Sequence, residues 1–249
     1  EFSFDLISKL EIRNTFLPPT ALKMMKSFNP SKTVKNLKLR TVGSGGEALG
    51  EDLLEWGKQI LGVGINEFYG QTECNLTVSN CGAIMPTKQG SIGKPVPGHE
   101  VRIINENGEL IKEPGLDGEI IVKSDTPVSF LKYWENDKAT KQKVKDGWLY
   151  TGDFAYKDEE GYFYFKGRKD DIINTSGYRV GPSEVEDAVL SHPKVSMVAV
   201  IGIPDKLRGQ VIKAFVVPRD HNIVLTENET LTFKPFSKMK LSSEGAKQA

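Results

Sequence analysis

Five consecutive residues, Tyr69-Gly70-Gln71-Thr72-Glu73, combine three kinds of chemistry that could serve one ligand. An aromatic ring can stack on a base, a hydroxyl can donate to a phosphate oxygen, and a carboxylate can hold Mg²⁺. The segment follows a predicted strand that ends at Phe68, and open α/β sheets bind ligands at the carboxyl ends of their parallel strands. Taken alone, such a segment is more often a polar loop with a half-buried tyrosine.

A second candidate is the glycine-rich segment at residues 43–48, which lies between a predicted strand and a predicted helix. It matches G-x-G-x-x-A, and Glu67 follows Ala48 by nineteen positions, so the dinucleotide-binding unit of an NAD-dependent oxidoreductase is a formal alternative. Short glycine-rich turns of this kind are also common for steric reasons alone. The sequence contains no G-x-x-x-x-G-K-[ST], which excludes a standard Walker loop.

Two further groups of polar residues lie in the second half of the chain. Asp153 precedes Arg168 by fifteen positions, and a carboxylate that accepts from vicinal hydroxyls beside a guanidinium suits a ribose or a phosphate. Taken singly, Asp153 is typical of a turn and Arg168 of a surface ion pair. Residues 176–179 precede Gly181-Pro182-Ser183-Glu184, which predicts a glycine-rich loop entering a helix, or only a capped helix start.

The elements that must position these residues change in kind about midway. Residues 2–10 resemble the inside of an amphipathic helix, and up to residue 70 we predict strands at 14–17, 37–42 and 64–68 alternating with helices at 20–27 and 51–61. Turn-separated strands at 100–104, 118–123, 148–156 and 162–165 predict a small antiparallel barrel or sandwich. A strand at 171–174, a helix at 184–190 and strands at 195–203 and 210–217 follow.

The predicted fold is therefore α/β, with parallel-sheet βα units, a small antiparallel β-barrel and a small, incomplete α+β domain at the C-terminal end. We place domain boundaries at 1–169 and 170–217, and we expect a loosely ordered tail at 218–249. The lysines at 138, 141, 143 and 145 indicate a solvated helix face.

Composition excludes several classes of function. The 249 residues carry 33 Lys and Arg against 33 Asp and Glu, which is not the charge balance of a general nucleic-acid or anionic-membrane binder. No apolar run approaches the roughly 18–20 residues needed to cross a bilayer, so we expect a soluble, cytoplasmic chain. Cys74 and Cys81 have neither disulfide-framework nor zinc-site spacing and are expected to be reduced thiols.

Six segments, in order and spacing, together resemble the acyl-adenylate-forming superfamily, and within it AMP-forming acyl-CoA synthetases of the short- to medium-chain type. The segments are G-G-E-A-L, Y-G-Q-T-E, G-S-I-G-K-P-V-P-G, Y-T-G-D, G-R-K-D-D-I-I and S-G-Y-R-V-G-P-S-E-V-E. The resemblance covers about residues 12–217. It implies a ligase in which a carboxylate and ATP give acyl-AMP and pyrophosphate, after which the CoA thiol displaces AMP.

The resemblance also implies roles for individual residues in binding ATP, AMP and Mg²⁺. Gly46 and Glu47 would border the adenine, Tyr69 would stack on it, and Glu67 would sit near its amino group. Thr72 would contact the α-phosphate, and Glu73 would hold the metal ion.

In the second half, the resemblance implies that Asp153 binds both ribose hydroxyls, with support from Arg168. Asp170 would be the hinge of a mobile C-terminal domain. Ser176 and Gly177 would line the pantetheine tunnel for CoA, with Arg179 near a phosphate.

One position bears on the substrate. Acetate-specific members of the family carry a bulky tryptophan where this chain has Gly70, so the resemblance implies a deeper acyl pocket and a medium-chain or aryl carboxylate.

The sequence departs from the family pattern in two places. It contains no Ser/Thr/Gly-rich phosphate loop ending in P-K and no P-K-T-x-x-G-K segment, and after Pro218 it no longer resembles the family. We therefore expect a C-terminal half fragment that adenylates very poorly on its own, which leaves a non-catalytic nucleotide-binding fragment as an alternative. Exposed sheet edges and apolar surface would favour self-association as a homo-oligomer.

Overall fold

The structure is a computed structural model that describes residues 2–28, 37–47 and 49–219. The chain forms two compact units, one of Glu1–Thr151 with Ala155–Phe165 and the other of Gly152–Phe154 with Lys166–Ala249. The tail expected at 218–249 lies, from residue 220 onward, outside the described residues. Among the residues described, no helix is long and apolar enough to cross a membrane.

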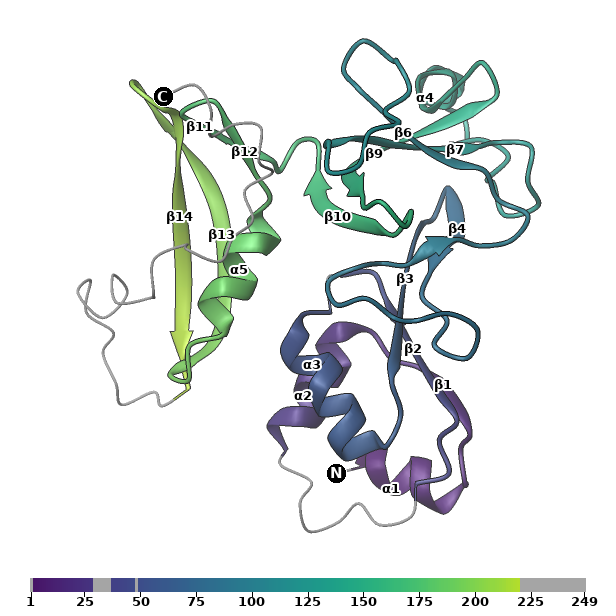
Figure 1. Ribbon diagram of the computed structural model, residues 1–249, viewed down its shortest axis with the longest axis vertical. Helices are drawn as coiled ribbons and strands as arrows, with labels where there is room; N and C mark the ends of the chain where they lie inside the picture. Colours follow the sequence, from purple (N-terminus) through teal and green to yellow (C-terminus); the bar gives the residue numbers. More distant parts are fainter. Residues whose placement is uncertain (1, 29–36, 48, 220–249) are drawn as a thin grey trace. The chain divides into compact units, whose positions relative to one another are not determined.

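The first sheet is mixed, with five strands in chain order (Figure 1). Strands β1 (Asn14–Phe16), β2 (Thr41–Gly45) and β3 (Ile65–Gln71) pair in parallel. Strands β4 (Cys74–Ser79) and β5 (Lys94–Pro95) extend the sheet in antiparallel fashion. The predicted parallel βα units are present, and the antiparallel edge that follows β3 was not predicted.

Helices pack against the parallel strands of this sheet (Figure 1). They are α1 (Phe2–Lys9), α2 (Pro19–Ser27) and α3 (Glu51–Trp56), and α3 continues into the π-helical segment η2 (Gly57–Leu61). Pro19 occupies the first turn of α2, where a missing amide hydrogen costs nothing. The shared core contains Phe4, Ile7, Leu22, Met25, Leu39, Val42, Leu49, Leu53, Trp56, Leu61 and Ile65.

The position of β2 corrects the sequence-based prediction of a strand at 37–42 followed by a glycine-rich turn. The observed strand is Thr41–Gly45, so Gly43 and Gly45 lie in the strand. A Cβ atom on Gly45 would lie 2.7 Å from the Phe68 carbonyl oxygen and 2.9 Å from its ring, and one on Gly43 would lie 3.0 Å from the ring. The glycines are therefore required by the Phe68 ring on the neighbouring strand, a contact that sequence spacing does not reveal.

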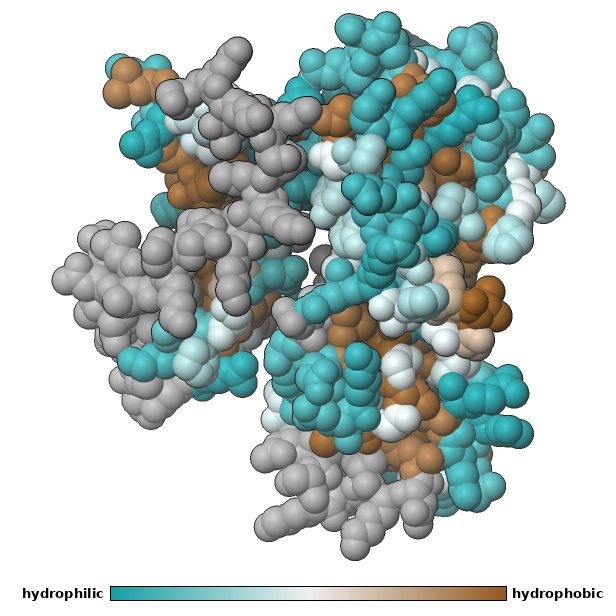
Figure 2. Space-filling view, in the orientation of Figure 1, coloured by the Kyte–Doolittle hydropathy of each residue, from teal (hydrophilic) through white to brown (hydrophobic). Residues whose placement is uncertain are grey.

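The second sheet is a curled antiparallel half-barrel with the strand order β10-β9-β7-β6, with β8 paired to β9. Its strands are β6 (Val101–Ile104), β7 (Gly118–Lys123), β8 (Val144–Lys145), β9 (Trp148–Lys157) and β10 (Phe163–Arg168), and helix α4 (Asp137–Lys143) precedes β8. Its core includes Ile103, Ile120, Val122, Leu149 and Phe163, all at most 1% exposed. On the face shown in Figure 2, hydrophilic residues cover most of this region.

The second unit contains a four-stranded sheet with the order β12-β11-β14-β13. Its elements are β11 (Ile173–Thr175), β12 (Tyr178–Val180), α5 (Pro182–Leu190), β13 (Val195–Asp205) and β14 (Gly209–Pro218). Val185 and Val189 of α5 pack on Ile173, Val195 and Val200 of the sheet. The α/β class with a following α+β part agrees with the prediction from the sequence.

Candidate functional site

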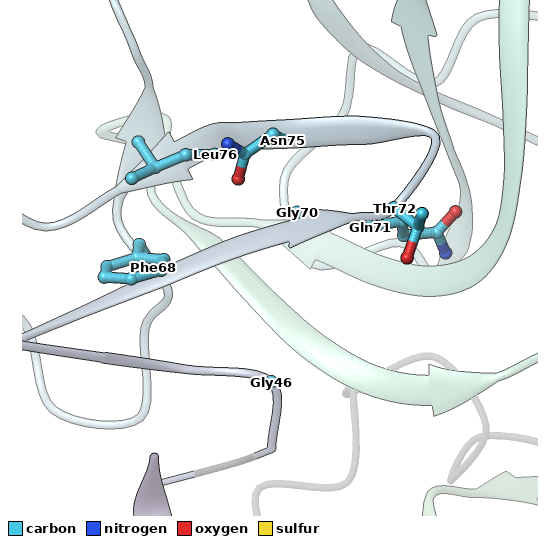
Figure 3. Close-up of a pocket in the computed structure, with 7 residues that line it drawn as sticks. All are labelled: Gly46, Phe68, Gly70, Gln71, Thr72, Asn75 and Leu76. Atoms are coloured by element: carbon cyan, nitrogen blue, oxygen red, sulfur yellow. The ribbon is translucent and has the colours of Figure 1, made fainter. Parts of the chain in front are cut away.

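A pocket of about 550 Å³ lies along the β3–β4 hairpin. Figure 3 shows its lining on both strands of the hairpin and on the loop after β2. The lining residues are Gly46, Phe68, Gly70, Gln71, Thr72, Asn75 and Leu76. Three of the residues singled out from the sequence, Gly46, Gly70 and Thr72, therefore line one hollow in the first unit.

The segment Y-G-Q-T-E lies differently from the prediction, which ended the strand at Phe68. Strand β3 continues to Gln71, and only Thr72 and Glu73 form the turn to β4. Alternation along the strand points Tyr69 into the core, where it is 8% exposed and packs on Phe165 with ring centroids 6.1 Å apart. The tyrosine ring proposed to stack on a base is thus mostly covered by the protein itself.

Glu73 is held in the turn by a tyrosine that sequence reasoning missed. The Tyr133 hydroxyl donates a hydrogen bond to the Glu73 carboxylate, and the Phe130 amide donates to the Glu73 carbonyl at 2.9 Å. Burial and the hydrogen bond to Glu73 raise the pKa of Tyr133 to about 12. Tyr133 is therefore a neutral donor at physiological pH, and no spacing rule links it to a residue 60 positions away.

The loop between β2 and α3 is tied down by two carboxylates. Glu67 is 6% exposed and accepts a hydrogen bond from the Leu49 amide at 3.1 Å. Glu47 is exposed and accepts from the Thr20 hydroxyl at 3.0 and 3.1 Å. Gly46 has φ = 98°, a backbone conformation that favours glycine.

The same loop lacks the geometry that a dinucleotide fingerprint needs. That fingerprint places its glycines in the turn that opens the helix, whereas here Gly43 and Gly45 lie inside strand β2 beneath Phe68. Ala48, the last position of the pattern, lies outside the described residues. Glu67, which would bind a ribose in the oxidoreductase alternative, instead accepts the Leu49 amide.

Contrary to the prediction from the sequence, Lys143 does not lie on a solvated helix face. Its ammonium donates to the Gln71 side-chain carbonyl at 3.3 Å and to the Thr151 backbone carbonyl at 2.9 Å. The Gln71 amide also donates to the Thr151 carbonyl, at 3.0 Å. Lys138 and Lys141 of the same helix are exposed, as predicted. Lys143, the last residue of α4, is therefore bonded to Gln71, the last residue of β3.

The remaining site residues lie in the second unit. Asp153 of β9 is 5% exposed, and Arg168, at the end of β10, is exposed. The Lys169 amide donates to the Gly152 carbonyl at 2.7 Å, so the backbone segments that carry Asp153 and Arg168 run side by side. Asp170 occupies an exposed turn immediately after β10.

Residues 176–179 form a hairpin, which corrects the prediction of a loop entering a helix. Ser176 and Gly177, with φ = 50° and 82°, make a two-residue turn between β11 and β12. Arg179 is in β12, and its guanidinium lies 5.7 Å from the centre of the Phe154 ring. The helix begins after this hairpin, at Pro182.

The donor set fits Mg²⁺ only in combination with a phosphate ligand. Among the described residues there is no group of three His, Cys, Asp or Glu side chains that could hold a metal ion. Mg²⁺ is usually bound by one or two carboxylates together with substrate phosphates and water. A single oriented carboxylate, Glu73, beside an open pocket suits that mode of binding.

Comparison with known protein families decides the classification. The family model described as "AMP-binding enzyme" matches residues 1–134, more than half of the chain, and the model "AMP-binding enzyme C-terminal domain" matches residues 184–233. This chain belongs to the AMP-binding enzyme family. The NAD-dependent alternative receives no support from these matches.

Relatives within the AMP-binding enzyme family are named acyl-CoA ligases. The chain is 40% identical over 219 residues to the uncharacterized acyl-CoA ligase YtcI of Bacillus subtilis (87% of this chain, 41% of YtcI). It is 40% identical over 212 residues to 4-hydroxybutyrate–CoA ligase 1 of Metallosphaera sedula (85% of this chain, 37% of the relative). The chain thus spans about two-fifths of the length of these curated relatives.

A solved structure of the family shares the fold. The anthranilate CoA ligase AuaEII, in complex with anthranoyl-AMP, superposes with a TM-score of 0.83 at 29% sequence identity. The match covers 93% of this chain and 44% of AuaEII. The predicted membership of the adenylate-forming enzymes is therefore confirmed.

Proposed function

We propose that this chain is the part of an AMP-forming acyl-CoA synthetase that carries the adenylate pocket. The observation that carries the proposal is the β3–β4 hairpin, in which Thr72 lines an open pocket and the next residue, Glu73, is anchored in the turn by Tyr133. In the reaction, a carboxylate oxygen attacks the α-phosphorus of ATP and pyrophosphate leaves. The CoA sulfur then attacks the acyl carbon, loses its proton, and AMP leaves.

The chain's own residues would serve the first step by binding and orientation. The Thr72 hydroxyl, which is exposed, would donate to an α-phosphate oxygen, and Glu73 would hold Mg²⁺, which offsets phosphate charge. Gly46 and Glu47 would border the adenine. Glu67 would position the adenine indirectly, because it anchors the loop that carries Gly46 and Glu47. Tyr69, whose ring is mostly buried, would offer the base only an edge.

For the ribose and for CoA we assign residues of the second unit. Asp153 would accept from the ribose hydroxyls, with Arg168 beside it. Asp170, in its exposed turn, would be the hinge between domains at 1–169 and 170–217. The hairpin turn Ser176-Gly177 and Arg179 would contact CoA when the smaller domain moves.

We propose a medium-chain or aryl carboxylate as the acyl substrate. Gly70 lines the pocket and contributes no side chain to it. AuaEII, named for anthranilate, acts on an aryl acid, which agrees with this class. In the intact synthetase, activity should fall from hexanoate to acetate, and acetate as the best substrate would contradict the assignment.

The proposed function is tested by calorimetric titration of the chain with a non-hydrolysable acyl-adenylate analogue. We expect saturable binding that Asp153→Asn weakens at least about tenfold, as expected when a hydrogen-bonded charged group is lost. Asp171→Asn, which changes an exposed carboxylate in the turn after β10, is the matched control and should bind normally.

Two measurements on the same samples separate the alternatives. NAD⁺ should not compete with the analogue, and competition would favour the oxidoreductase alternative. Pyrophosphate release from ATP and hexanoate distinguishes catalysis from binding alone. A chain that binds the analogue but releases no pyrophosphate is a nucleotide-binding fragment, and a folded chain that does not bind it contradicts the proposal.

A further inference from the structure

The segment of residues 126–145, which contains no residue of the proposed site, runs along the turn between β3 and β4. Its backbone pairs with the start of β4. The Phe130 amide donates to the Glu73 carbonyl at 2.9 Å, and the Asn75 amide donates to the Val128 carbonyl at 3.3 Å. Cys74 and Ser129 form an isolated antiparallel bridge between these two bonds. The segment thus adds a short stretch of sheet to the hairpin at its turn.

One side chain of this segment reaches Glu73. The Tyr133 hydroxyl donates to the Glu73 carboxylate, and the Tyr133 ring packs on Phe130 with centroids 4.9 Å apart. The Tyr133 amide donates to the Thr140 hydroxyl of α4 at 3.0 Å. The tyrosine is therefore fixed at its backbone, its ring and its hydroxyl.

A second side chain reaches the other side of the turn. Lys143, Gln71 and the Thr151 carbonyl form a closed triangle of hydrogen bonds of 2.9 to 3.3 Å. Because the ammonium can only donate, it requires the carbonyl oxygen of Gln71 to face it and turns the amide nitrogen toward Thr151. Gln71 precedes Thr72 directly, so this triangle fixes the last residue of β3 before the turn.

Helix α4 has no fully buried residue along Asp137–Lys143. Ordinary surface helices in proteins are stabilised chiefly by packing an apolar face on a core. Helix α4 instead starts at an Asn136 cap, whose side chain accepts the Ala139 amide at 3.0 Å, and supplies Thr140 and Lys143 to the contacts above. The helix also leads directly into β8, which pairs with β9, so chain continuity and these two contacts together hold it beside the turn.

We propose that residues 126–145 act as a clamp on the Thr72–Glu73 turn, with Tyr133 and Lys143 as its positioning residues. Tyr133 sets the direction of the Glu73 carboxylate, and Lys143 sets Gln71. The consequence for Mg²⁺ rests on the proposed function, because it takes Glu73 as a metal ligand. The clamp on the turn does not depend on that function.

The test uses five variants of the full chain, of which four form two matched pairs and the fifth is a conservative replacement. Tyr133→Phe removes only the hydroxyl that reaches Glu73, and Tyr164→Phe removes another tyrosine–carboxylate hydrogen bond, a longer one to Asp158 at 3.3 Å. Lys143→Met removes the inward ammonium, and Lys141→Met removes an exposed ammonium from the same helix. Lys143→Arg keeps a donor and should restore wild-type behaviour.

The first measurement is hydrogen–deuterium exchange at the amides of Asn75 and Phe130, which join the clamp to the hairpin. Tyr133→Phe and Lys143→Met should speed exchange at these amides about fivefold, as expected for the loss of one hydrogen bond. Tyr164→Phe and Lys141→Met should leave both amides unchanged. Unchanged exchange in Tyr133→Phe and Lys143→Met, or equal acceleration in the controls, would overturn the clamp.

The second measurement is ATP affinity with and without Mg²⁺, determined by calorimetry on the same proteins. Tyr133→Phe should reduce the gain in affinity that Mg²⁺ provides, whereas general loosening of the fold would weaken binding equally in both conditions. An unaltered gain would overturn the role of Tyr133 at Glu73. A wild-type chain that binds no ATP would contradict the proposed function, while the exchange result would still decide the clamp.

Discussion

The carboxylate of Glu67 accepts a hydrogen bond of 3.1 Å from the backbone amide of Leu49, inside the first unit. This bond joins the middle of strand β3 to the loop that leads into α3. Both residues are nearly inaccessible, with 6% and 2% exposure. A buried carboxyl group bonded in this way ties the loop, which includes Gly46 at the pocket, to the sheet.

We predict that Glu67→Ala destabilises the chain by about 1–3 kcal/mol, because it leaves the buried Leu49 amide without its acceptor. Glu67→Gln keeps a carbonyl oxygen that can accept from the Leu49 amide, so its loss of stability should be clearly smaller. Urea unfolding of both variants measures the difference. Glu47→Ala, at an exposed carboxylate of the same loop, is the control. Equal losses for Glu67→Ala and Glu67→Gln would show that the Leu49 bond is not what matters.

Strand β2 should not tolerate a methyl group at Gly45. A Cβ atom there would lie 2.7 Å from the Phe68 carbonyl oxygen, so we expect Gly45→Ala to lower the free energy of unfolding by about 1–3 kcal/mol. Gly64→Ala is a matched control, because a Cβ there meets nothing within 4 Å. That variant should be neutral or up to about 1 kcal/mol more stable. Denaturant midpoints compare the two, and similar values would contradict the close packing.

Gly70 lines the pocket, and the backbone of the neighbouring strand β4 leaves no room for a side chain at this position. A Cβ atom at this position would lie 2.3 Å from the Leu76 nitrogen and 2.8 Å from the Cys74 carbonyl oxygen. We therefore expect even Gly70→Ala to displace β4 and to accelerate amide exchange along Cys74–Ser79. Asn75→Ala changes another residue of the pocket lining and should leave that exchange unchanged. If Gly70→Ala exchanges like the wild type, the hairpin is more adaptable than its geometry indicates.

The β11–β12 turn gives a prediction that depends on backbone conformation alone. Gly177 has φ = 82°, and a Cβ atom there would meet nothing within 4 Å. Gly177→Ala should therefore lower the free energy of unfolding by about 1–2 kcal/mol through backbone strain rather than through a steric clash. Ser176→Asn should be neutral or stabilising, because asparagine is favoured in two-residue hairpin turns. Thermal unfolding checks both. A neutral Gly177→Ala would mean that the turn relaxes to another type.

Two tyrosines should make the chain sensitive to alkali. Burial is the largest cause that raises the pKa of Tyr133 and of Tyr164 from 10.0 to about 12. Because the native pKa values exceed the unfolded value, stability is full below pH 10 and is lost as the pH rises from 10 through 12.

Unfolding measured across that pH range should show this loss as a falling free energy of unfolding. Tyr133→Phe and Tyr164→Phe should each make the fall less steep, and the double variant should be shallower than either. Identical slopes in all four proteins would contradict the assignment.

Local patterns in the sequence predicted most elements of the fold. Helix α2 begins within one residue of its expected start because prolines fix where it begins, and β7 has the predicted bounds, Gly118–Lys123. The family was also predictable, because six motifs kept their order over about two hundred residues. For the elements the signal lies in neighbouring residues, and for the family it lies in short motifs and their order along the chain.

The errors arose where distant residues decide the structure. Strand β2 extends through Gly43 and Gly45 because Phe68 packs over them, and β3 runs on to Gln71 because β4 pairs with it. Tyr133 and Lys143 reach the turn from 60 and 72 positions away. Their types and spacing mark them as an ordinary aromatic residue and a surface lysine. The roles proposed for Asp153, Arg168, Asp170, Ser176, Gly177 and Arg179 remain predictions.

The long sequence separation of the contacts around Glu73 has a consequence for how the protein forms. Gln71 and Thr151 are 80 positions apart. Closing a loop of that length loses more chain entropy than forming a contact between residues that are close in sequence. During synthesis, helices α1 to α3 can pack on β1 to β3 before residue 151 exists. The Thr72–Glu73 turn cannot reach its final geometry until strand β9 has left the ribosome. The pocket is therefore expected to be among the last parts of the first unit to mature.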